Sequence, residues 1–97
     1  MPVDLDLGQL VRSCTGRDRG RYYLVVGKHD NRRVKLVDGH RRPVNRPKVK
    51  NVAHLQRIGR VAYAVRECLQ NGEPITDEMV RAALAEFHYD LSRKEGD

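Results

Sequence analysis

The sequence predicts a mainly β fold with added helices, namely a small β-barrel followed by a two-helix hairpin. Short β-prone segments separated by turn signals occupy residues 9–50, whereas apolar residues recur at helical spacing from Leu55 onward. The length of 97 residues suits one domain with a modest core. We therefore expect a barrel at residues 1–57, a hairpin at 58–91 packed on or beside it as one compact unit, and a frayed tail at 92–97.

The first two strands are expected at residues 9–14 and 22–26. The second of these is rich in β-branched and aromatic residues, which favour strands. Gly27 either ends it or allows a bulge. Residues 15–21, "TGRDRGR", form a loop, because its two glycines bracket residues that favour no regular element.

A turn cluster at residues 29–32 leads into a third strand at 33–37, where basic and apolar residues alternate. Asp38-Gly39 is the strongest hairpin signal in the chain. Two prolines then limit residues 41–51 to a short edge strand or an extended loop. Several short strands at this spacing indicate a small barrel rather than a βαβ sheet.

An apolar stripe at steps of three and four predicts the first helix, which ends at Asn71-Gly72. Gly59 weakens its first turn, so the helix begins at Leu55 or near Arg60. The stripe consists of Leu55, Ile58, Ala62, Val65 and Leu69.

The second helix follows Thr76, which is a favourable N-cap, and Asp77 and Glu78 suit the positive end of its dipole. Ile75 and Val80 are spaced for a hydrophobic staple. Its apolar stripe consists of Val80, Ala83, Leu84, Phe87 and Leu91. The short connection predicts that the two helices pack antiparallel.

The positive charge is confined to one part of the chain. Residues 1–60 carry 15 Lys and Arg against 5 Asp and Glu, whereas residues 61–97 carry 4 against 8. Solubility explains a net charge but not its segregation, so the basic part indicates a polyanionic partner, nucleic acid above all.

Other classes of function find little support. Cys14 and Cys68 lack metal-ligand spacing and do not make a disulfide scaffold, so both are expected to be reduced, with Cys14 a buried apolar residue. The scattered histidines suggest no metal site, and no catalytic constellation is present, so neither an enzyme nor a cofactor is expected. The N-terminus does not resemble a signal peptide, and no apolar run approaches the ~20 residues of a membrane span. We expect a cytoplasmic protein.

One continuous stretch carries a resemblance to a known family. The segment "GQLVRSCTGRDRGRYYLVVGKHDNRRVKLVDG" resembles the KOW motif, a strand–loop–strand unit, with Gly20 at the hallmark glycine and Arg21 directly after it. With "RRPVNRPKVKN" it looks like KOW-containing large-subunit ribosomal proteins of the L-fourteen-e type and their small bacterial relatives, over residues 6–56. Tyr22-Tyr23 depart from the small or polar residues usual there, and the hairpin is no part of the motif.

The resemblance implies an SH3-like barrel with an RNA-binding face, and a protein associated with ribosomal RNA. Arginine binds phosphate in a fork, and glycine lets the backbone approach a phosphate closely. If the first loop is extended, its three arginines point to one side, while Asp18 braces an arginine or caps the turn. The expected RNA-binding residues are Arg17, Arg19, Gly20, Arg21, Arg41, Arg42, Arg46, Lys48 and Lys50.

Two further expectations concern geometry. Loops at one end of a small barrel lie close together, so the two basic clusters are expected to form one patch. Tyr22 and Tyr23 point to opposite faces of their strand, one into the core and the other into surface packing or, less favoured, a stacking platform for a base.

Two alternatives to RNA binding stay open. A protein-interaction adaptor would use the barrel and the acidic hairpin to bind ribosomal or transcription proteins, and an exposed apolar stripe on the hairpin would favour it. If the stripe packs on the barrel, the hairpin is a structural brace. DNA binding ranks last, because the second helix carries only Arg81 before its last turn.

Overall fold

The computed structural model describes residues 5–96, so the expected start of the barrel at residue 1 and the last residue of the expected tail lie outside the described residues. Its elements are, in chain order, β1 (Gln9–Ser13), β2 (Tyr22–Lys28), β3 (Arg33–Val37), β4 (Lys48–Asn51), the 3-10 helix η1 (Val52–His54), β5 (Leu55–Val61), α1 (Tyr63–Gln70) and α2 (Asp77–Gly96). The mixed β-then-α order agrees with the sequence prediction.

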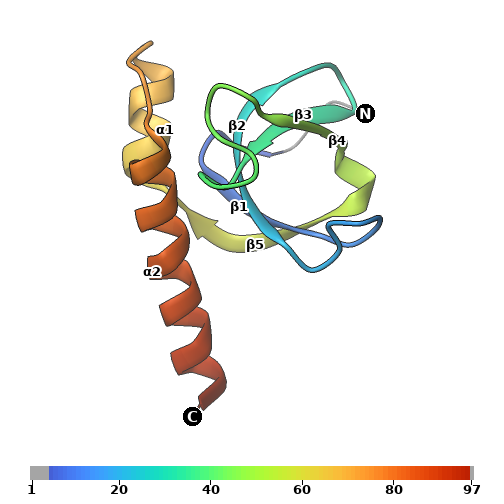
Figure 1. Ribbon diagram of the computed structural model, residues 1–97, viewed down its shortest axis with the longest axis vertical. Coiled ribbons are helices and arrows are strands. Elements are labelled where there is room, and N and C mark those ends of the chain that lie inside the picture. The colour runs from blue at the N-terminus through green and yellow to red at the C-terminus, as the bar shows by residue number, and fades with distance from the viewer. Residues whose placement is uncertain (1–4, 97) are drawn as a thin grey trace.

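The five strands form one antiparallel sheet in the order β4-β3-β2-β1-β5, which curves strongly in Figure 1. The first three strands lie where the sequence predicts them, and the expected bulge occurs between Val25 and Gly27. β4 is the short edge strand, and it pairs with β3. Asp38-Gly39 does not make a tight two-residue hairpin, because residues 38–47 form a longer loop between these strands.

The prediction of a helix from Leu55 is wrong. Residues 55–61 are β5, which pairs with β1, and the first helix begins only at Tyr63. The sides of a strand alternate, so residues three apart face opposite ways. Leu55 accordingly packs on one face of the sheet and Ile58 on the other. The apolar residues that suggested one helical stripe therefore belong partly to a strand and partly to the helix that follows it.

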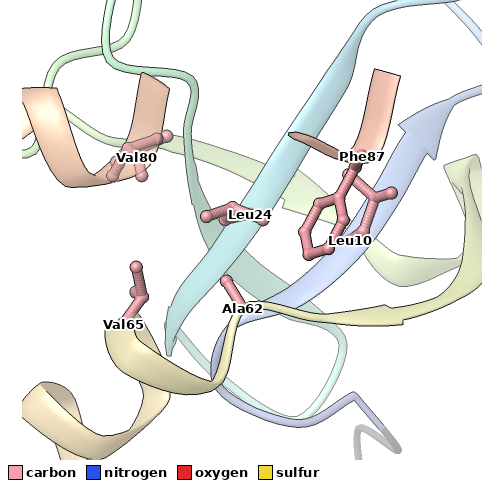
Figure 2. Packing of buried hydrophobic residues seen from close by; sticks show 7 residues of the cluster. Leu10, Leu24, Ala62, Val65, Val80 and Phe87 are labelled. Carbon is pink, nitrogen blue, oxygen red and sulfur yellow. The ribbon is translucent and has the colours of Figure 1, made fainter. Parts of the chain in front are cut away.

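Both faces of the sheet are buried, each by a separate apolar cluster. The cluster on the concave side contains Val11, Tyr23, Val25, Val34 and Leu36. The cluster on the helix side, shown in Figure 2, contains Leu10, Leu24, Val37, Ala62, Val65, Val80 and Phe87. Alternation along β1 and β2 supplies both clusters, because neighbouring residues face opposite ways.

The two helices cover the cluster on the helix side of the sheet. The predicted stripe of α2 packs there in full, since Ala83, Leu84 and Leu91 are partly buried against it. The N-cap prediction is confirmed, because Thr76 Oγ1 accepts a hydrogen bond from the Met79 N–H at 3.1 Å. α2 continues to Gly96, beyond the predicted end at Leu91. Neither helix is long and apolar enough, within the described residues, to cross a membrane.

Candidate functional site

Two loops from distant parts of the sequence meet around one hollow. The β1–β2 loop (residues 14–21) and the β3–β4 loop (residues 38–47) lie at the same end of the sheet, as the sequence analysis expected of the two basic clusters. We call this site the basic hollow. Its lining residues are Arg17, Asp18, Arg21, Tyr23, Arg41, Arg42, Arg46 and Lys48.

The five arginines of the basic hollow are not neutralised by any residue between 5 and 96. None of them forms an ion pair with another residue in the described part of the chain. Arg17, Arg41 and Arg46 are exposed, whereas Arg21 and Arg42 are half-buried. Like charges held together at a concave surface focus a positive potential into the solvent. An anion is therefore the ligand that this surface favours.

Three of the predicted site residues do not line the basic hollow, namely Arg19, Gly20 and Lys50. The β1–β2 loop is a tight turn rather than an extended segment. The Arg19 N–H donates to the Gly16 carbonyl at 3.3 Å, and the Arg21 N–H to the Asp18 carbonyl at 2.9 Å. The three arginines of this loop consequently do not share one side, and Arg19 lies outside the site.

Gly20 has a conformational role in the β1–β2 loop. Its φ is +90°, a value that residues with a side chain rarely adopt. Its N–H donates to the Ser13 carbonyl at 2.8 Å, while the Ser13 N–H donates to the Arg21 carbonyl at 2.9 Å. Gly20 therefore closes the loop at the start of β2, and its amide is already used within the protein.

Asp18 is the centre of a buried polar cluster beneath the basic hollow. Its side chain is 5% exposed and contacts the Lys50 ammonium at 2.7 Å and the Lys48 ammonium at 3.1 Å. Ser13 Oγ donates to Oδ1 at 2.7 Å, and the Tyr23 hydroxyl donates to Oδ2 at 2.9 Å. The expectation that Asp18 braces an arginine or caps the turn is wrong, because the side-chain partners of Asp18 among the described residues are two lysines, a serine and a tyrosine.

The cluster shifts two pKa values in opposite directions. Burial alone would raise the pKa of Asp18, but the hydrogen bonds from Lys50, Ser13, Lys48 and Tyr23 hold it well below the ordinary value of 3.8. Burial, together with the hydrogen bond to Asp18, raises the pKa of Tyr23 to about 12. Asp18 is thus charged and Tyr23 neutral across the physiological range.

Lys50 belongs to the scaffold of the site rather than to its surface. Its side chain is 9% exposed, and it also donates to the Thr15 carbonyl at 2.8 Å. It therefore ties β4 to the β1–β2 loop. Lys48 is more accessible, with 26% of its side chain exposed, and it both contacts Asp18 and lines the basic hollow.

Helix α2 holds the other basic loop in place. The Asp77 carboxylate accepts the Val44 N–H at 2.8 Å, and the Arg81 guanidinium donates to the Gly39 carbonyl at 2.7 Å. Within the loop, Asp38 Oδ1 accepts the N–H groups of both His40 and Arg42 at 2.9 Å. These contacts fix the backbone that carries three of the five arginines.

The two tyrosines face opposite sides of β2, as predicted. Tyr23 is 1% exposed and belongs to the concave cluster. Tyr22 packs on the helix-side cluster and meets the His88 ring edge-on, with centroids 5.1 Å apart. Cys14 is exposed, contrary to the expectation of burial, because it follows the last residue of β1.

Sequence reasoning missed the polar cluster under the arginines. The position of Asp18 between two arginines was a signal that its charge stabilises the fold. Nothing in the sequence indicated that Ser13 and Tyr23 would donate hydrogen bonds to it. Comparison with known proteins adds no relative, since no protein-family model matches the chain and no curated protein aligns with it significantly. The functional inference therefore depends on the basic hollow and on the contacts that shape it.

Proposed function

We propose that this protein binds structured RNA through the basic hollow, with ribosomal RNA as the foremost candidate. The single observation that carries the proposal is the convergence on one concave surface of five arginines from two loops, none of them in an ion pair with the residues that the structure describes. Asp18 does not oppose an anion there, because Lys48 and Lys50 neutralise its charge.

The chemistry of the site suits a folded phosphate backbone. A guanidinium group binds two phosphate oxygens at once and can also stack on a base. Positively charged side chains that neutralise phosphates release counterions, which makes the affinity strongly dependent on salt. Recognition of structured RNA would then come from shape, because the positions of the arginines must match the spacing of the phosphates.

The proposed fold type is an SH3-like barrel of the KOW kind. The order of strands, the position of Gly20 and the short η1 between β4 and β5 support this reading of the curved sheet. The resemblance to ribosomal KOW proteins supports a ribosome-associated, cytoplasmic role without catalysis. No cofactor is part of the proposal.

The helices act as a brace for the sheet and for the β3–β4 loop. Their apolar stripe packs on the sheet, so it is not available as a docking surface for a protein. Asp77 and Arg81 of α2 instead fix the β3–β4 loop. Both observations favour RNA binding over the protein-interaction adaptor.

Sedimentation of a cell lysate through gradients at low and high salt, combined with ultraviolet crosslinking to RNA, tests the proposal. We expect the protein to migrate with ribosomal subunits at low salt, to leave them at high salt, and to crosslink to ribosomal RNA. Migration as free protein at low salt, without crosslinked RNA, would overturn the proposal and favour the adaptor.

A further inference from the structure

A second hollow lies between the β1–β2 loop, the start of the β3–β4 loop and helix α2. We call it the side hollow. Its lining residues are Gly20, Arg21, Tyr22, Asp38, His40, Arg81, Leu84, Ala85 and His88. Arg21 lines this hollow and the basic hollow alike, so the two sites are neighbours.

The side hollow differs in chemistry from the basic hollow. Tyr22, Leu84 and Ala85 give it apolar surface, and the ring of His88 stands edge-on to that of Tyr22, with an interplanar angle of 76°. Its volume of about 440 Å³ is that of a small-molecule site. A flat aromatic group fits such a surface better than a phosphate does.

The polar groups of the side hollow suit the edge of a base. Asp38 Oδ1 accepts two backbone N–H groups, whereas Oδ2 accepts no hydrogen bond from the described residues. An ionised carboxylate only accepts hydrogen bonds, so its free oxygen favours a ligand edge that donates. An exocyclic amino group of a nucleobase is such a donor.

We propose that the side hollow receives one unpaired base of the same RNA whose phosphates occupy the basic hollow. The inference rests on the proposed function and names its substrate class, which is RNA with a bulged or looped nucleotide rather than a continuous duplex. Arg21 binds the phosphate next to that nucleotide, and the base packs against Tyr22 and Leu84. A base stacked within a duplex cannot enter such a hollow, whereas an unstacked base binds aromatic and cationic side chains readily.

Three RNA hairpins with the same stem provide the test. One carries a single bulged adenosine, the second carries an abasic residue at that position, and the third is fully paired. Fluorescence anisotropy at one low salt concentration gives each affinity. We expect the adenosine bulge to bind about tenfold more tightly than the abasic bulge, within the range that base–aromatic stacking supplies.

Two variants of α2 locate the effect. Ala85→Phe fills the side hollow from an exposed position, and Ala82→Phe makes the same change at an exposed position outside that hollow. We expect Ala85→Phe to abolish the preference for the adenosine bulge while leaving the affinity for the abasic hairpin unchanged. Ala82→Phe should keep the preference, and circular dichroism checks that both variants fold.

The outcomes separate the inference from the proposed function. Equal affinity of the wild-type protein for the adenosine and abasic bulges overturns the inference, even if both bind in a salt-dependent manner, and this comparison needs no variant. A preference that survives in Ala85→Phe places the base elsewhere and also overturns it. Failure of all three hairpins to bind at low salt counts against RNA binding itself.

Discussion

The Asp18 carboxylate accepts a hydrogen bond from the Lys50 ammonium at 2.7 Å, where the side chains are only 5% and 9% exposed. Asp18 belongs to the β1–β2 loop and Lys50 to β4, so this buried pair joins the two parts of the chain that carry the basic hollow. Asp18 thus holds the basic loop in position, and its partner Lys50 is one of the residues that the sequence analysis expected to bind RNA.

Asp18→Asn should destabilise the fold by on the order of 3 kcal/mol, because it leaves the buried ammonium of Lys50 without a counter-charge. Urea unfolding followed by circular dichroism measures the change. Asp30→Asn is the control, since Asp30 pairs with Arg33 at an exposed turn and its loss should matter far less. An equal loss in both variants would contradict the structural role of the cluster.

The Asp18–Lys50 pair also predicts how the free energy of unfolding depends on pH. The pKa of Asp18 is lowered in the folded state, so its contribution is fully present above the ordinary value of 3.8 and is lost as the pH falls below it. Unfolding free energies measured between pH 6 and 3 should therefore decline less steeply in Asp18→Asn than in the wild type. If the unfolding free energies of both proteins declined in parallel with falling pH, Asp18 would not be the group whose protonation destabilises the fold.

Asp77→Ala tests the anchoring of the β3–β4 loop by α2. The Val44 N–H loses its acceptor, so its hydrogen exchange should become faster and RNA binding should weaken, although Asp77 does not line the basic hollow. Glu78→Ala removes the same charge from the same helical turn, and the Glu78 side chain makes no hydrogen bond or ion pair with the described residues of the loop. Unchanged exchange at Val44 in Asp77→Ala would show that the helix does not hold the loop.

Gly39→Ala tests how closely the loop approaches the helix. Gly39 has a φ of +78°, and an added Cβ would lie 2.8 Å from both Arg81 Cγ and the Asp77 carbonyl oxygen. Gly72 has a similar φ of +71°, but no atom of a non-adjacent residue in the described part of the chain lies within 4 Å of such a Cβ. We expect Gly72→Ala to cost about 1–2 kcal/mol from backbone strain alone. Gly39→Ala should cost clearly more in urea unfolding, and equal losses would refute the close packing.

Much of the fold could be predicted from local patterns. β-Branched and aromatic residues placed β2, and alternation placed β3. The two prolines limited the next segment to a short edge strand or an extended loop, and Thr76 marked the start of α2. The error at Leu55 arose because a strand followed directly by a helix can imitate one helical stripe. The pairing of β5 with β1, across more than forty residues, was the information that local spacing lacks.

The candidate site was predicted less completely for a related reason. Charge and the adjacency of loops indicated the basic patch, and the structure brings Arg17 and Arg21 together with Arg41, Arg42 and Arg46. Whether a lysine serves a ligand or a buried carboxylate depends on three-dimensional contacts. Lys50 and Asp18 lie far apart in the sequence, so nothing local distinguished Lys50 from the cations that face the solvent.

The most direct test of the central claim is the salt dependence of binding to a structured ribosomal RNA fragment. Arg46→Gln removes a charge from the basic hollow, and Arg32→Gln removes the same charge from the β2–β3 turn at the other end of β2. We expect Arg46→Gln to weaken binding and to reduce the slope of log K against log salt by roughly one. Arg32→Gln should leave both unchanged. Identical slopes and affinities in Arg46→Gln and the wild type would contradict the assignment of RNA binding to this surface.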